Sequence, residues 1–232
     1  MTADAVRPVT FRRLLLELRE FSSAAPITLQ MLPSLSLHRL TKYLLVTAAL
    51  AVLAAGTARA ATETYAIDPV HSSVGFSIRH FVGKVPGKFT KFSGTITVDR
   101  ANLEKSSVTA SIEIASVATA DSDRDAHLKS PDFFDAAKYP AMTFASTSWK
   151  KTGEDTFDIT GDLTIKGIKK RVVLKTTLLG FGPGSQGAQL SGWEATTTIK
   201  KADFDLKGPA ILGTMLGDDV TITIAVESAL KK

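Results

Sequence analysis

The sequence predicts an all-β fold, an eight-stranded antiparallel barrel with one or two short helical segments. Along residues 61–232, apolar side chains alternate with polar ones, which is the pattern of strands that bury one face. Glycine-containing turn sequences separate the alternating segments, and signals for helices are few. Strands of this kind bury their apolar faces by packing as a sandwich or by closing into a barrel, and closure also removes exposed sheet edges.

The first predicted strand illustrates the pattern, because Val74, Phe76 and Ile78 alternate with polar or small neighbours. The eight predicted strands cover residues 73–79, 92–98, 108–114, 141–150, 157–165, 170–180, 189–199 and 220–227. Lys166-Gly167 lies between two of them and is predicted to form a tight hairpin. Residues 151–153 and 180–187 are predicted to be the other clear turns.

Short helical segments are predicted only between residues 121 and 134. Asp121 or Ser122 can cap a turn over residues 123–128, because their side-chain oxygens accept bonds from free backbone N–H groups. Ser130-Pro131 predicts a second short turn that runs through Phe134. Residues 201–217 are interrupted by glycine and proline and are predicted to form a long loop.

Residues 1–60 read as a leader rather than as part of the barrel. An uncharged, mostly apolar run of 12 residues, 44–55, follows basic residues and precedes Ala58-Arg59-Ala60. This order is typical of a secretory signal, and the run is shorter than the roughly 20 residues that span a bilayer. We therefore expect a true start at Met31, a signal peptide over 31–60, cleavage after Ala60, and a single exported domain over 61–232. A transmembrane anchor is the alternative.

Composition excludes several classes of function. The chain has 28 Lys+Arg and 23 Asp+Glu, a formal net charge of +5. Residues 1–60 hold seven of these bases and three of these acids, which leaves 21 and 20 in residues 61–232. A nearly neutral domain lacks the basic stripe that nucleic-acid binding needs, so we expect no nucleic-acid partner. The absence of cysteine excludes disulfides, Cys-ligated metals and thiol nucleophiles.

Several motifs in residues 61–232 are typical of one protein family, and the third of them is the most specific. They are Tyr65-Ala66-Ile67-Asp68-Pro69-Val70-His71-Ser72, Val74-Gly75-Phe76-Ser77-Ile78-Arg79-His80, Arg124-Asp125-Ala126-His127-Leu128-Lys129-Ser130-Pro131-Asp132-Phe133-Phe134-Asp135, Lys138-Tyr139-Pro140, Phe144-Ala145-Ser146, Gly161-Asp162-Leu163-Thr164-Ile165-Lys166-Gly167 and Gly217-Asp218-Asp219-Val220. With these motifs, residues 61–232 resemble the YceI-like family, a group of bacterial periplasmic proteins. One departure lies in the last long loop, where the family often has Asp-Phe-Gly and this chain has Asp203-Phe204-Asp205.

The resemblance implies a lipocalin-like barrel in the periplasm that holds a polyisoprenoid or similar lipid in its interior. It implies no catalytic residue. On this basis the predicted partner is an isoprenoid or fatty-acid-like lipid, which would be stored, shielded or transported, and no cofactor or metal is expected. Pairing of two barrels into a homodimer through exposed strands is left open.

Candidate tail contacts are the apolar residues at expected inward positions. They are Val74, Phe76, Ile78, Phe92, Ile112, Ile114, Phe133, Phe134, Phe144, Leu163, Ile165 and Trp193, each of which could equally be an ordinary core residue. Small residues at Gly94, Ala110 and Gly161 suggest an interior with room for a thin apolar guest. Arg79, His80, Lys84 and Lys88 cluster around an expected turn over 83–87 and are candidates for binding an anionic head group, or else simply solvated side chains.

Two alternatives to lipid carriage remain at this point. A lipid-modifying enzyme would use His71, His80 and His127 with nearby acids. His71 and His80 are nine residues apart, which places them on opposite faces of a regular strand, and His127 is expected to hold its own segment through hydrogen bonds. The other alternative is a structural or stress-response module whose barrel is filled by its own side chains.

Overall fold

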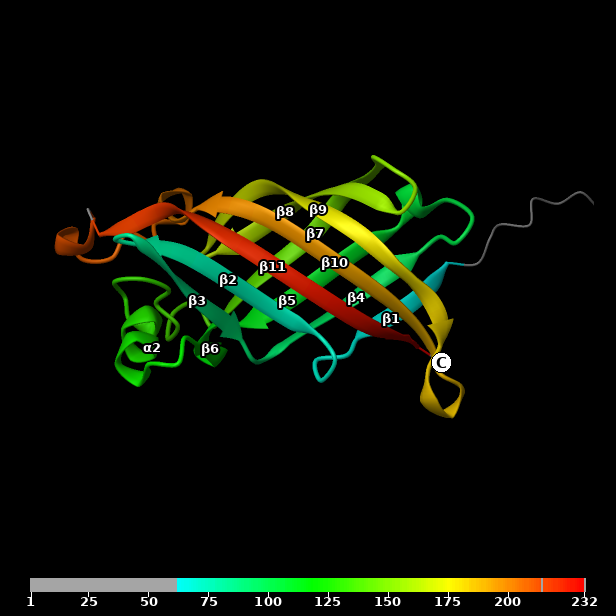
Figure 1. Cartoon of the computed structure of the whole chain (residues 1–232), viewed down its shortest axis with the longest axis horizontal. Helices are drawn as coiled ribbons and strands as arrows, with labels where there is room; N and C mark the ends of the chain where they lie inside the picture. Colours follow the sequence, from blue (N-terminus) through cyan, green and yellow to red (C-terminus); the bar gives the residue numbers. More distant parts are fainter. Residues whose placement is uncertain (1–61, 214, 232) are drawn as a thin grey trace, which may run out of the picture. The chain divides into compact units, whose positions relative to one another are not determined.

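The computed structural model describes residues 62–213 and 215–231. In these residues eleven strands form one antiparallel sheet that closes into a barrel, and one α-helix accompanies it (Figure 1). The strands are β1 (Glu63–Ile67), β2 (Ser73–His80), β3 (Gly83–Phe89), β4 (Phe92–Val98), β5 (Ser107–Glu113), β6 (Val117–Ala118), β7 (Ala141–Lys151), β8 (Thr156–Ile165), β9 (Ile168–Pro183), β10 (Gln189–Lys200) and β11 (Leu216–Leu230). The α-helix of these residues is α2 (Ser122–Lys129). The predicted leader and its cleavage site lie outside the described residues.

The eleven strands occupy eight positions around a closed barrel, as the sequence predicts. β1 and β2 pair with opposite ends of β11, so together they act as one barrel strand. β4 pairs with β1 and β5, and β3 pairs with β2 and β6, so β3 with β4 and β5 with β6 also count as one strand each. The ring closes through β7, β8, β9, β10 and β11.

One predicted turn is wrong, because residues 83–87 belong to strand β3. Gly83, Pro86 and Gly87 are turn-forming residues, but β3 has a second partner only at Lys88 and Phe89, so Pro86 lies on a free edge where its missing N–H costs little. Gly87 leaves space for an aromatic ring, since a Cβ there would lie 2.3 Å from Cζ of Phe76. The actual turn consists of Phe81 and Val82.

Several other local predictions are confirmed, whereas the turn predicted over 180–187 begins only after Pro183, where β9 ends. Lys166 and Gly167 form the two-residue hairpin between β8 and β9, with φ of +52° and +77°, the left-handed values that such a turn needs. The Asp121 side chain caps α2 by accepting a hydrogen bond from the Arg124 N–H. Residues 131–134 form a turn, and residues 201–213 form a long segment with short 3-10 turns, although β11 begins at Leu216, inside the loop predicted over 201–217. No helix among the described residues has both the length and the apolar character needed to span a membrane.

Two bulges change which residues face the interior. The register of β7 against β8 shifts between Ser146 and Ser148, so the inward positions move from Met142 and Phe144 to Trp149. The register of β9 against β10 also shifts, beside Leu179, and Phe181 then packs against Trp193 with ring centroids 5.8 Å apart. An extra residue in one strand reverses the alternation beyond it, which is how both bulges act here.

The small inward residues mostly accommodate neighbouring side chains. A Cβ on Gly161 would lie 2.3 Å from Cζ of Phe144, and one on Gly94 would lie 2.6 Å from Cδ1 of Ile67. The expectation that both positions leave free space is therefore only partly right. Ala110, by contrast, does line the interior cavity described below.

Replacing Gly161 with alanine should lower the free energy of unfolding by about 1–3 kcal/mol, because the new Cβ overlaps the Phe144 ring and lies 2.7 Å from the backbone oxygen of Ala145. Chemical denaturation measures this change. The matched control is Gly182→Ala, since a Cβ at Gly182 has no neighbour within 4 Å. Equal stability of the two variants would contradict the packing argument.

Candidate ligand-binding site

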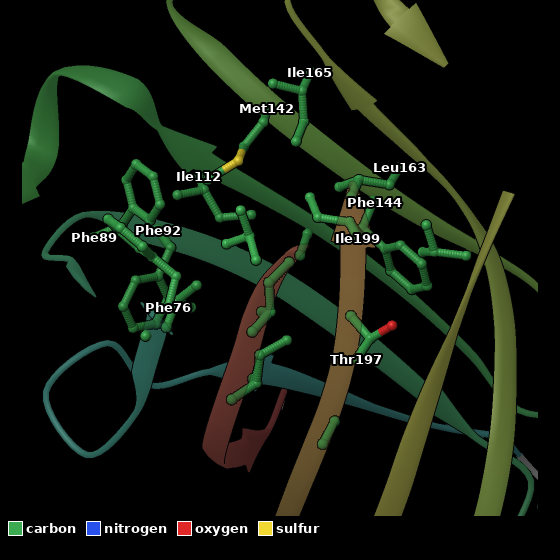
Figure 2. A pocket seen from close by; sticks show the side chains of 18 of the residues that line it. Phe76, Phe89, Phe92, Ile112, Met142, Phe144, Leu163, Ile165, Thr197 and Ile199 are labelled. Atoms are coloured by element: carbon green, nitrogen blue, oxygen red, sulfur yellow. The ribbon is translucent and has the colours of Figure 1, made fainter. Parts of the chain in front are cut away.

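The barrel encloses a cavity of about 390 Å³, a volume within the usual range of small-molecule pockets, which is about 300–1,000 Å³. Its walls come from the inward faces of the strands and are almost entirely apolar. Figure 2 shows Phe76, Phe89 and Phe92 gathered on one side and Phe144 and Leu163 on another. The interior of the barrel is therefore not filled by its own side chains.

Most predicted tail contacts lie on the cavity wall. The wall includes Val74, Phe76, Ile78, Phe92, Ile112, Phe133, Phe134, Phe144, Leu163, Ile165 and Trp193. Ile114 does not belong to it: β5 ends at Glu113, and Ile114 begins a 3-10 turn that buries its side chain elsewhere in the core. Whether the wall residues touch a ligand stays a prediction. Sequence reasoning missed many other wall residues, among them Phe89, Trp149, Thr176, Ala195 and Thr197.

Aromatic rings close one end of the cavity. We call Tyr65, Trp149, Phe157, Phe181 and Trp193 the aromatic floor. Their rings form a continuous chain, with centroids 5.4 Å apart for the two tryptophans and 5.8–6.1 Å apart for the other neighbouring pairs. Only the two tryptophans line the cavity, so the open space ends at their side chains.

The two tryptophans of the floor differ in their hydrogen bonds. Nε1 of Trp193 donates to Oγ of Ser191 at 3.0 Å, and that hydroxyl lies 2.7 Å from Oγ of Ser228. Both serines are buried, so the three side chains satisfy one another inside the barrel. Nε1 of Trp149 is buried and has no hydrogen-bond partner among the described residues. Trp149 therefore contributes packing alone to the floor.

Two cationic side chains line the other end of the cavity, which we call the mouth. Arg124 of α2 and Lys201, which follows β10, both line the cavity and remain partly exposed. Arg124 donates to Oγ1 and to the backbone oxygen of Thr119, at 2.8 and 2.7 Å. Within the described residues, neither Arg124 nor Lys201 forms an ion pair with a carboxylate. The mouth therefore offers positive charge to an anionic group.

The predicted head-group residues are only partly at the mouth. His80 lines the cavity. Arg79 and Lys84 do not, because they are cross-strand partners on the outer face of β2 and β3, and Lys88 shares that face. The mouth cations that sequence reasoning missed are Arg124 and Lys201.

The three histidines of the described residues, His71, His80 and His127, occupy different environments. His127 lines the cavity, and its Nε2 lies 3.0 Å from Oδ2 of Asp132, so it does hold its own segment as expected. His71 is not part of the cavity. Its Nδ1 lies 2.8 Å from Oδ2 of Asp68 and 3.6 Å from Oε1 of Glu227, which links the loop between β1 and β2 to β11.

The contact between His71 and Asp68 should weaken as the pH rises. The hydrogen bond to Asp68 raises the pKa of His71 above its usual 6.5, so the contribution of the charged imidazole is complete below pH 6.5 and is lost as the pH passes through the raised value. The same bond lowers the pKa of Asp68 below 3.8, so the carboxylate contributes until strongly acidic pH.

Titration of the His71 ring by NMR, with hydrogen exchange at the amide of Val70, measures this effect. We expect exchange to accelerate above pH 6.5 in the wild type and to be independent of pH in this range in His71→Gln, after correction for intrinsic rates. A His71 pKa at or below 6.5 would contradict it.

Together these features define a closed antiparallel barrel with an apolar internal cavity and a cationic mouth. The YceI-like domain matches residues 65–228. Protein YceI of Escherichia coli is 40% identical over 185 residues, which cover 78% of this chain and 93% of that protein. The chain belongs to the YceI-like family.

Solved structures agree with the fold. A Campylobacter jejuni YCEI protein is 35% identical with a TM-score of 0.59, and the match covers 65% of this chain and 88% of that one. A domain from Saccharophagus degradans, described as a polyisoprenoid binding domain, has a TM-score of 0.58 at 16% identity, over 72% of this chain and 98% of that one. At that identity the likeness shows the shared fold.

Proposed function

We propose that this barrel binds a long-chain isoprenoid or fatty amphiphile, with the tail in the cavity and the head group at the mouth. The apolar cavity of about 390 Å³ between the aromatic floor and the mouth is the observation that carries the proposal. An apolar chain in water gains about 0.8 kcal/mol for each methylene that it buries. About fifteen buried carbons therefore gain on the order of 12 kcal/mol, of which ordering costs remove several. The remainder suffices for micromolar binding.

The proposed role is storage, shielding or transport of this amphiphile in the periplasm. The predicted signal peptide supports export, and the fold shared with a polyisoprenoid binding domain supports an isoprenoid as one class of ligand. A carrier needs an enclosed apolar space and an open end, and both are features of this barrel. We propose binding rather than catalysis, and the homodimer stays a prediction.

Native mass spectrometry of the protein purified from its host tests the proposal. We expect a bound lipid mass, and we expect delipidated protein to take up hexadecanoic acid or geranylgeraniol. A protein that carries no lipid and takes up neither probe would contradict the proposal.

The head-group position is tested by comparing hexadecanoic acid with hexadecanol. Charged hydrogen bonds at a partly exposed site should favour the acid, and Lys201→Gln should reduce the acid-to-alcohol affinity ratio about three- to tenfold. A change in the barrel itself alters the affinities for the acid and the alcohol alike, so it cancels in their ratio. Lys84→Gln is the matched control, because this lysine lies on the outer face of β3. A larger effect of Lys84→Gln than of Lys201→Gln would place the head group elsewhere.

A further inference from the structure

Exposed apolar side chains gather next to the mouth of the cavity. Val82 is fully exposed, Ile211 is 78% exposed and Phe81 is 53% exposed. Phe81 and Val82 form the turn after His80, and Ile211 precedes Leu212; both His80 and Leu212 line the cavity. Figure 1 shows the hairpin of β2 and β3 and the segment before β11 at the same end of the barrel. We call Phe81, Val82 and Ile211 the apolar rim.

The apolar rim is held in place by the surrounding structure. The backbone N–H of Phe81 donates to the oxygen of Met215 at 2.9 Å, which joins the hairpin to the residue before β11. Nη1 of Arg79 donates to the oxygen of Phe81 at 3.0 Å. The Phe81 ring also makes an edge contact with His80, with centroids 4.6 Å apart. These contacts fix Phe81 relative to the mouth.

Phe81 adopts a backbone conformation that is unfavourable for a bulky residue. Its φ is +49°, in the left-handed region where glycine is the residue that costs least. A phenylalanine here therefore costs backbone strain and also exposes an aromatic ring to water. Such combined costs are typical of functional positions, which makes a partner for this ring the natural explanation.

The hairpin that carries Phe81 and Val82 is positively charged. The hairpin from Ser73 to Phe89 contains Arg79, Lys84 and Lys88 and no acidic residue. Arg79 and Lys84 are direct cross-strand partners on its outer face. Like charges in this arrangement repel each other unless an anion lies between them. The hairpin thus combines an apolar tip with cations suited to phosphate groups.

We propose that the apolar rim, with Arg79 and Lys84 beside it, docks the mouth of the barrel onto an anionic lipid bilayer. Phe81, Val82 and Ile211 enter the interfacial region, as exposed apolar side chains of peripheral proteins do, and the two cations bind lipid phosphates. A tail then passes between bilayer and cavity without crossing water. The transfer of a tail rests on the proposed function. The docking itself does not, because the rim is a surface feature that is independent of what the cavity contains.

Flotation with vesicles of phosphatidylcholine, with and without phosphatidylglycerol, tests the docking. We expect the wild type to float with anionic vesicles and the double variant Phe81→Ser, Val82→Ser to lose at least about tenfold in partition. Arg79→Gln with Lys84→Gln should lose the preference for phosphatidylglycerol. The matched control is Val70→Ser, because Val70 is 82% exposed but lies in the loop between β1 and β2, toward the other end of β11.

Failure of wild-type protein to float, or an equal loss for Val70→Ser and the double variant, would overturn the docking. Uptake of hexadecanoic acid added without vesicles separates this outcome from failure of the proposed function. Wild-type protein that binds the acid but does not float refutes the docking alone. The double variant should bind the acid as the wild type does, which also shows that it folds.

Discussion

Replacing Ala195 with phenylalanine is expected to weaken binding of a long acyl or prenyl tail by roughly a hundredfold while the barrel stays folded. Ala195 lies on β10 and lines the cavity, as do its cross-strand partners Thr176 and Ile224. A ring at this position takes the space of about four methylenes, which at about 0.8 kcal/mol each removes about 3 kcal/mol of tail burial. The same ring fills empty space, so the free energy of unfolding should rise by about 1 kcal/mol.

Titration calorimetry with hexadecanoic acid and chemical denaturation measure these two changes in one variant. Affinity is expected to fall while the free energy of unfolding rises. A variant that simply unfolds would instead lose both stability and binding. Ala145→Phe is the matched control, since Ala145 is exposed on the outer face of β7. Unchanged binding by Ala195→Phe would show that the tail does not occupy the cavity.

The barrel could be predicted from sequence because each strand keeps one face inside. Alternation such as Val220, Ile222, Ile224 and Val226 has a single burial solution, and Lys166-Gly167 has the turn chemistry of a two-residue hairpin. The split of three barrel strands into β1 with β2, β3 with β4, and β5 with β6 could not be predicted, because it depends on which strand ends meet in the closed ring.

The aromatic floor depends on bulges, which carry little sequence signal. Simple alternation from Met142 and Phe144 places Ser148 inside, whereas the shift after Ser146 places Trp149 there. The sequence signal for this bulge was Trp149 itself, a large apolar residue that is out of phase with the alternation of its strand. Trp193, in contrast, was correctly predicted to lie in the interior.

At the mouth, the wrong placement of Arg79 could have been avoided from the sequence, whereas the positions of Arg124 and Lys201 could not be predicted from it. Arg79 follows the inward residue Ile78, so alternation alone already places it outside. Arg124 reaches the mouth through its bonds to Thr119, and Lys201 follows the end of β10. Those positions depend on tertiary packing of short segments, which periodicity does not report.

The departure from the family motif at Asp205 has a structural explanation. Asp205 adopts φ of +56°, the left-handed conformation that glycine occupies at least cost. Aspartate tolerates this region better than most residues. Its carboxylate also lies 3.1 Å from Nζ of Lys207 and 3.7 Å from Nζ of Lys166, and these lysines hold the pKa of Asp205 below its usual value. The loop therefore keeps its turn without the glycine.

Replacing Trp149 with alanine is expected to remove part of the floor and shift the preferred ligand toward longer tails. The open space ends at Trp149 and Trp193, beyond which lie Phe157 and Phe181. Loss of a buried tryptophan should lower the free energy of unfolding by about 3–5 kcal/mol. Because Nε1 of Trp149 has no hydrogen-bond partner among the described residues, its removal breaks no hydrogen bond, whereas Trp193→Ala also disrupts the bonds with Ser191 and Ser228.

A series of saturated fatty acids of increasing length measures the shift. In the wild type, affinity should rise by up to roughly fourfold per methylene, which is about 0.8 kcal/mol, until the tail reaches the floor and the rise stops. In Trp149→Ala the rise should continue to longer chains, and bound long-chain acid should restore part of the lost stability. Trp149→Phe, which keeps an aromatic ring, should shift the limit less. A limit at the same chain length in wild type and Trp149→Ala would mean that the tail stops short of the floor or does not point toward it.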